Sequence, residues 1–331
     1  MEVNYPAPQE APETIPFTKP LFNRFLESGR EGRNEWWRYT LGILLTFIVG
    51  YQMFGIVPLV IIVISGVVSQ EFTLNEFLAN PANLQNHEFL HVSKNTLLAA
   101  ILFIFVAALV FLVIAIRYIH RKRIMSVIAS DRRPFSFNRY FSGFGVWLAF
   151  NILQLVISLA VNPDNFHVVF EPIPFIGSLV ICLFLLPIQT GWEEIFVRGY
   201  LIQSIGLKTK TGLWPWIITS VLFGLLHIMN AEVQHNGIAM MLPQYIFPGL
   251  VFGAIVLMDE RLELAMGMHF ANNLFGALTI SNSDSTLQAN TIWSVDSIVS
   301  TPDIVMSYVM QLAVVVLLYK VYKWDIKKLY K

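Results

Sequence analysis

Eight long apolar stretches constrain the fold of this 331-residue chain more than any other feature. A helix needs about 20 apolar residues to cross the hydrocarbon core of a bilayer, and each stretch reaches or nearly reaches that length. The chain is 13% charged, whereas a soluble domain carries roughly 25% charged residues. The pattern predicts an all-α, polytopic transmembrane bundle of about eight helices, over residues 40–68, 95–116, 141–161, 173–203, 213–230, 240–258, 262–280 and 303–321.

Two details of these stretches predict local geometry. Gly55 and Pro58 fall inside the first stretch. Because proline removes a backbone hydrogen bond, we expect a kink or a break there. Only residues 259–261 separate the sixth stretch from the seventh, which predicts a tight hairpin.

Lysine and arginine alternate between the two sides of the predicted bundle. They occur before the first stretch, after every second stretch and in the tail, whereas residues 162–172, 231–239 and 281–302 contain none. Positive residues accumulate in cytoplasmic loops. The pattern therefore predicts an integral, multi-pass membrane protein with both termini cytoplasmic, in the plasma (inner) membrane if the source is bacterial.

The predicted helices divide the chain into four segments. Residues 1–39 form a polar cytoplasmic leader, and 40–161 form transmembrane helices 1–3. Residues 162–280 form a core of helices 4–7, and 281–331 form an outer loop, the last helix and a basic tail. The net charge is zero, which argues against a nucleic-acid partner. The lipid bilayer is the implied partner, and the oligomeric state stays open.

Ionisable side chains inside membrane helices are costly and usually functional. Glu193 and Glu194 are adjacent in the fourth stretch, and Arg198 lies four residues after Glu194 on the same helical face. The arginine can hold Glu194 ionised, while Glu193 points about 100° away around the helix. One anchored carboxylate beside a second in another environment is a way to make a general base. A structural ion pair is the alternative.

Two further stretches carry polar groups. His227 lies near the end of the fifth stretch, at a depth similar to that of Glu193 when both are counted from the lysines between their helices. His269 and Asn273 are four residues apart in the seventh stretch and share a face. A simple count leaves His269 too shallow, so either its hairpin is sunk into the protein or the predicted boundaries are wrong. A structural hydrogen bond between helices is the alternative.

Other histidines are weaker candidates. His87, Glu88 and His91 match the His-Glu-x-x-His pattern of zinc proteases. The match lies in an outer loop and has no evident third ligand, so we favour a chance match. His120 and His167 also lie in loops, where we expect them to be solvated.

Three motifs in order resemble those of a known family. Each lies on its own predicted helix: Glu193 and Glu194 with Arg198, Phe223 with His227, and His269 with Asn273. This order resembles the CPBP family of CAAX proteases and bacteriocin-processing enzymes, which includes type II CAAX prenyl endopeptidases. The resemblance covers roughly residues 173–280.

The resemblance implies an intramembrane endopeptidase that acts on a peptide or a membrane protein. By analogy, Glu193 would activate water, and His227 would hold that water or share its proton. His269 and Asn273 would form an oxyanion hole. Glu194 would brace the site together with its arginine.

Several alternatives stay open. Arg198 and Phe223 would support the site, and the favoured scheme needs no cofactor. A zinc-dependent version would use Glu193, His227 and His269 as ligands and leave a position open for water. A non-catalytic scaffold or a bacteriocin-immunity protein would use the same fold without cleavage. The motifs do not indicate whether a substrate is prenylated.

Overall fold

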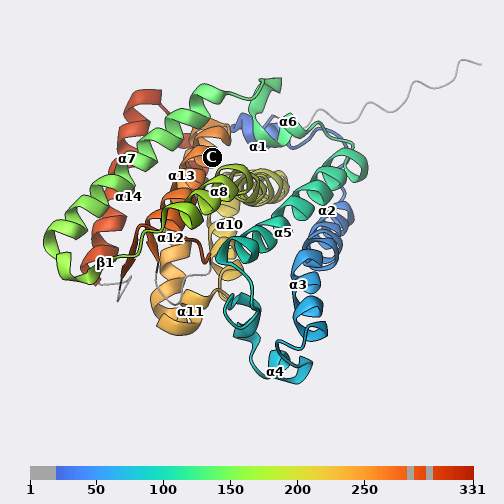
Figure 1. Cartoon of the computed structure of the whole chain (residues 1–331). Helices are drawn as coiled ribbons and strands as arrows, with labels where there is room; N and C mark the ends of the chain where they lie inside the picture. Colours follow the sequence, from blue (N-terminus) through green and yellow to red (C-terminus); the bar gives the residue numbers. More distant parts are fainter. Residues whose placement is uncertain (1–19, 282–286, 296–300) are drawn as a thin grey trace, which may run out of the picture.

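The computed structural model describes residues 20–281, 287–295 and 301–331, and most of them are helical (Figure 1). Within these ranges, six helices are long and apolar enough to cross a membrane: Trp36–Val68, Lys94–Ile119, Phe137–Val161, Pro172–Thr209, Ile238–Asp259 and Asp303–Tyr322. Two shorter helices, Leu213–Leu226 and Glu263–Thr279, occupy the other two predicted stretches. The predicted all-α polytopic bundle is confirmed.

The first three spans form the N-terminal half of the bundle. The first comprises α2 (Trp36–Leu44), the π-helical η1 (Leu45–Gly55) and α3 (Val57–Val68). The second comprises α5 (Lys94–Ile114) and the π-helical η3 (Ala115–Ile119), and the third is α7 (Phe137–Val161). Helix geometry changes between Gly55 and Val57, where a kink is predicted.

The C-terminal half contains the candidate site. Its helices are α8 (Pro172–Glu193), the π-helical η6 (Glu194–Leu201), α9 (Ile202–Thr209), α10 (Leu213–Leu226), α12 (Ile238–Asp259), α13 (Glu263–Thr279) and α14 (Thr301–Tyr322).

Shorter elements connect the helices of both halves. They are α1 (Arg24–Ser28), α4 (Leu74–Ala79), α6 (Ile124–Ile128), α11 (Ala231–Asn236), α15 (Lys327–Tyr330) and the 3-10 turns η2 (Pro81–Gln85), η4 (Ser130–Arg132) and η5 (Pro163–Asn165). A small sheet has the order β1 (Phe166–Val168), β3 (Trp293–Val295), β2 (Ile280–Ser281), with β1 antiparallel and β2 parallel to β3.

Helix α8 lies in the middle of the bundle, with α7 and α14 on one side and α2, α3 and α5 on the other (Figure 1). It packs against α5 and α13, and α13 packs against α7. The last pair is close because glycines face the neighbouring backbone. A Cβ atom on Gly267 would lie 1.9 Å from the carbonyl oxygen of Tyr140, and one on Gly143 would lie 2.2 Å from that of Leu264. Small residues at such contacts let membrane helices approach closely.

The hairpin between α12 and α13 is sunk into the protein. Asp259, Glu260 and Arg261 are 7%, 5% and 6% exposed. The amide of Leu262 donates to the carbonyl of Ile128 (2.9 Å), the last residue of α6 (Ile124–Ile128). Of the two explanations for the depth of His269, the buried hairpin is the one observed.

The charges of this hairpin are paired with segments distant in sequence. Arg139 forms an ion pair with Asp259, and Lys328 of α15 lies 2.8 Å from a Glu260 oxygen. Arg261 instead pairs with Glu263, at 2.5 Å. These pairs are what make burial of the hairpin charges tolerable, since a buried charge without a partner is strongly destabilising.

Part of the predicted leader is packed onto this end of the bundle. Phe25 and Leu26 of α1 are buried. The leader also covers His120, and the expectation that His120 is solvated is therefore wrong. Its Nδ1 donates to the carbonyl of Arg33 (2.8 Å), and its Nε2 accepts from the hydroxyl of Tyr200 (2.7 Å).

Candidate active site

Glu194 is the centre of a fully buried charged cluster. Its side chain is 0% exposed, and that of Arg198 is 1% exposed. Arg198 Nη1 donates to Glu194 Oε1 (2.9 Å), so the predicted contact one turn apart is present. The guanidinium lies over the ring of Phe223, 4.0 Å from its centroid. His269 Nδ1 reaches the same Oε1 at 2.8 Å, and because a carboxylate only accepts, this nitrogen carries a proton.

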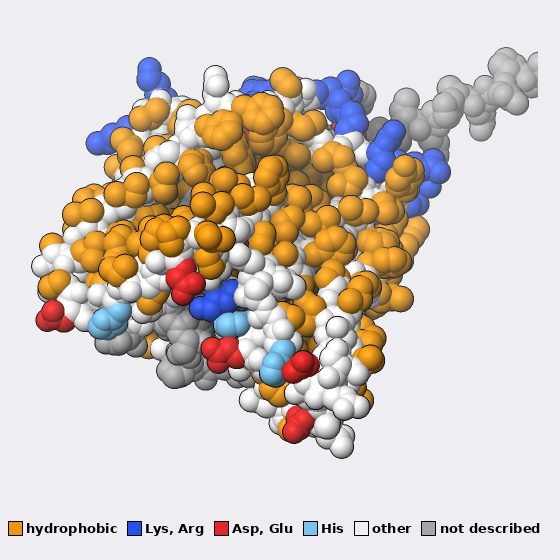
Figure 2. Space-filling model, in the orientation of Figure 1, with side chains coloured by type: hydrophobic (Ala, Val, Ile, Leu, Met, Phe, Trp, Pro, Cys, Tyr) orange, Lys and Arg blue, Asp and Glu red, His pale blue; other side chains and the backbone are white. Residues whose placement is uncertain are grey.

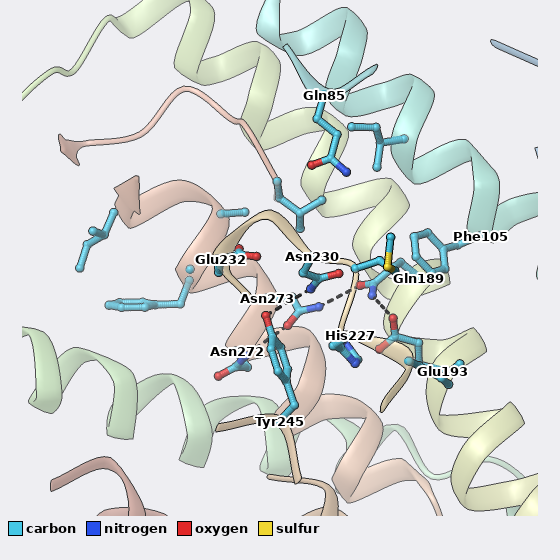
Figure 3. A pocket seen from close by; sticks show the side chains of 18 of the residues that line it. Gln85, Phe105, Gln189, Glu193, His227, Asn230, Glu232, Tyr245, Asn272 and Asn273 are labelled. Carbon is cyan, nitrogen blue, oxygen red and sulfur yellow. Dashed lines mark hydrogen bonds between the residues drawn. The ribbon is translucent and has the colours of Figure 1, made fainter. Parts of the chain in front are cut away.

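Glu193 lies on the other side of His269. Its Oε2 is 3.4 Å from His269 Nε2, so the imidazole lies between two carboxylates. Gln189 donates to Glu193 Oε1 at 2.6 Å (Figure 3). The buried Oε2 accepts no hydrogen bond from any described residue. An unsatisfied buried carboxylate oxygen is costly, which makes this atom the natural place for a water molecule or another donor.

Asn273 reaches Glu193 through Gln189. Its Nδ2 donates to Gln189 Oε1 at 2.9 Å, which completes a chain of side chains from Asn273 to Glu193 (Figure 3). Gln189 is not among the residues that the sequence predicts for the site, because a neutral amide inside a membrane helix is a weaker signal of function than an ionisable side chain. The signal was present, since Gln189 lies four residues before Glu193, on the same helical face.

His227 caps the end of α10 and lines the same cavity as Glu193. Its Nδ1 donates to the carbonyl of Phe223 (2.7 Å), which leaves Nε2 unprotonated in the neutral ring. The ring stacks on Tyr245, with centroids 4.4 Å apart, and lies between Tyr245 and Glu193 in Figure 3. Among the hydrogen bonds of the described residues, none joins His227 directly to Glu193.

The cavity has a volume of about 1010 Å³. Glu193, His227, Gln189 and Asn273 line it, whereas His269 lies behind Glu193. The π-helical stretch η6 begins directly after Glu193, and such irregular turns occur frequently at functional sites. The predicted site residues thus form two groups, those that line the cavity and those that are buried behind it and hold the first group in place.

The predicted zinc alternative has an incomplete donor set. Glu193 Oε2 and His269 Nε2 are separated by about the distance between two ligands of a tetrahedral zinc ion. Within the described residues, however, no three His, Cys, Asp or Glu side chains are grouped closely enough to hold a metal ion. Residues 87–91, with the His-Glu-x-x-His pattern, form turns rather than a helix, and His91 pairs with Glu71 at 3.4 Å.

The helices that carry the site residues are similar in sequence to a known protein family, over a range that we call the Rce1-like segment. Residues 175–275 match the model of a family described as type II CAAX prenyl endopeptidase Rce1-like. The predicted resemblance is confirmed. The Rce1-like segment contains all three motifs and ends just after Asn273. The family is one of proteases, so the match together with the membrane-spanning helices indicates a peptidase of the intramembrane kind.

One curated relative extends beyond the Rce1-like segment. It is the Bacillus subtilis (strain 168) protein YyaK, described as uncharacterized, which is 29% identical over 260 residues. The alignment covers 77% of this chain and 81% of that protein, so the similarity includes helices outside the Rce1-like segment. No solved structure matches the chain.

Proposed function

We propose that this protein is an intramembrane endopeptidase in which Glu193 activates water for attack on a peptide bond. The observation that carries the proposal is the environment of the Glu193 carboxylate. One oxygen is held by Gln189, and the other is buried, accepts no hydrogen bond from the described residues and lies close to His269 Nε2 at the wall of a large cavity. A general base needs such a fixed carboxylate with one free oxygen.

In the proposed mechanism, a water molecule lies between Glu193 Oε2 and His227 Nε2. The fixed tautomer of His227 presents an acceptor nitrogen to that water. Glu193 removes a proton as the water oxygen attacks the peptide carbonyl, and the same proton then passes to the leaving amine. Proton transfer of this kind contributes roughly 10²–10⁴-fold to rates.

The negative charge on the tetrahedral intermediate needs donors near the attacked carbonyl. Asn273 is at the cavity wall and uses its amide to orient Gln189, which in turn orients Glu193. We assign Asn273, at the cavity wall, to this stabilising role. His269 is held at Nδ1 by Glu194 behind Glu193, and we assign Glu194 with its arginine to anchoring this imidazole.

The test is cleavage by the isosteric variant Glu193→Gln in lipid nanodiscs. A quenched-fluorescent peptide library serves as substrate, and the matched control is Glu35→Gln, because Glu35 is exposed directly before α2, away from the cavity. We expect a loss of at least about 10²-fold in Glu193→Gln, with an unchanged thermal unfolding midpoint, and wild-type rates in Glu35→Gln. Normal turnover by Glu193→Gln would show that the proposal is wrong.

A further inference from the structure

The cavity reaches one end of the bundle, and that end is acidic. Residues of η2, η5, β1 and α11 line it, whereas α6, α9 and α15 at the opposite end contribute none of its described lining. In the segments 69–94, 162–171 and 228–237 there are six carboxylates and one cation, Lys94. The carboxylates are Glu71, Glu76, Glu88, Asp164, Glu171 and Glu232.

The space-filling view shows the same separation of charge. Lys and Arg side chains gather mainly at the end that carries α1 and the C-terminus, while Asp, Glu and His side chains, with a Lys or Arg side chain among them, surround a hollow at the other end (Figures 1 and 2). A cleft lined with one sign of charge raises the local concentration of ligands with the opposite sign. This end of the molecule therefore attracts cations and repels anions.

The charge of the cavity itself has the same sign. Its described lining contains Glu193, Glu232 and Asp303 and includes neither lysine nor arginine. A carboxylate on a bound ligand would thus meet repulsion and would find no lysine or arginine to pair with in the described lining. A lysine or arginine would instead be attracted, and more strongly between the apolar walls than in water.

The polar lining is rich in amide side chains, including Gln52, Gln85, Gln154 and Asn272. Each amide both donates and accepts hydrogen bonds. An unwound peptide presents one N–H and one C=O per residue, which these amides match. A lipid acyl chain offers no such groups, and its binding would leave the amides without partners.

We propose that the substrate is a positively charged peptide segment that enters from the acidic end and binds in an unwound form. The inference deepens the proposed peptidase function and rests on it for the act of cleavage. It also predicts that a free carboxylate terminus is not the feature by which this cavity recognises its substrate.

Binding to the Glu193→Gln variant tests the inference without requiring catalysis. Dye-labelled peptides share one neutral core and carry two Lys, two Gln or two Glu residues beside it. Fluorescence anisotropy measures their Kd for the variant in phosphatidylcholine nanodiscs. We expect the Lys peptide to bind at least about tenfold more tightly than the Glu peptide at low salt, with a ratio that falls as salt screens the charges.

A second substitution locates the effect. Adding Glu232→Gln is expected to reduce the preference for Lys, whereas Glu35→Gln, an exposed carboxylate at the opposite end, leaves it unchanged. Equal binding of the three peptides, tighter binding of the Glu peptide, or no binding of any would overturn the inference. Lys-selective binding without cleavage by the wild-type protein would support the inference about the substrate and refute the proposed peptidase function. Cleavage without a charge preference would support the peptidase function and refute the inference about the substrate.

Discussion

Lys122 allows a quantitative prediction because its ammonium group is buried outside the membrane-spanning helices. The residue is 1% exposed. Its Nζ donates to the carbonyl of Gly29 (2.7 Å) and to the hydroxyl of Tyr39 (2.9 Å), and no carboxylate among the described residues forms an ion pair with it. Burial lowers the pKa of Lys122 from 10.5 to about 7, because a charged amine is disfavoured away from water.

The lowered pKa makes the free energy of unfolding depend on pH. Between pH 7 and pH 10.5 the unfolded chain holds the Lys122 proton and the folded chain has released it. The unfolded state then binds more protons, so stability rises with pH across this window and is lowest below pH 7. From pH 7 to pH 9 the gain from this group is roughly 2 kcal/mol. His120, whose pKa burial lowers to about 4, stays neutral in both states over most of this range.

Lys122→Met removes the titrating group and keeps a side chain of similar length. Thermal unfolding in detergent is measured at pH 7, 8 and 9 for wild type, Lys122→Met and the control Lys208→Met, whose side chain is exposed. We expect the midpoint of wild type and of the control to rise with pH relative to that of Lys122→Met. Parallel pH profiles for all three proteins would refute the argument that Lys122 is neutral in the folded state at high pH.

Two further predictions concern the site and its helix packing. Gln189→Leu removes the donor that orients Glu193 and is expected to lower kcat about tenfold with little change in KM, measured with the cleaved library peptide; a change confined to KM would assign Gln189 to substrate binding instead. Gly267→Ala places a Cβ atom against Tyr140 and is expected to cost about 1–3 kcal/mol, read as a lower unfolding midpoint. Gly276→Ala in the same helix meets no atom within 4 Å and is the control; equal midpoints would contradict the packing argument.

Hydropathy predicts the helices well because the bilayer imposes a length and a composition on every span. The boundaries of the seventh stretch differ from those of α13 by one residue at each end. The contact of Glu194 with Arg198 was also predictable, since residues four apart on a helix are neighbours. These features depend on local sequence alone.

Features that depend on distant segments were not predictable. His120 is in a loop by sequence, yet the leader folds over it and Arg33 accepts its hydrogen bond. The placement of His269 between Glu193 and Glu194 requires helices α8 and α13 to cross at one depth. The hydrophobic periodicity of either helix does not predict that depth, because the depth is determined by the segments of the leader and the tail that pack over the helix ends.

The depth of His269 can be worked out from helix geometry. Glu193 precedes Thr209, the end of α9, by 16 residues, whereas His269 follows Glu263, the start of α13, by six. At the α-helical rise of 1.5 Å per residue, these lengths are at most about 24 Å, because η6 is π-helical and rises less, and about 9 Å. The contact between Glu193 and His269 therefore requires the start of α13 to lie up to about 15 Å deeper than the end of α9.

Short helices fill the space above the sunk hairpin. Helix α1 packs against α9, and α15 packs against α10 and α12. Asn23, at the start of α1, donates to the carbonyls of both Leu257 and Lys328, so it joins leader, hairpin helix and tail. Because these contacts fix where α13 begins, they also fix His269 against Glu193. The leader and tail, which contain none of the motif residues, are thus part of what assembles the site.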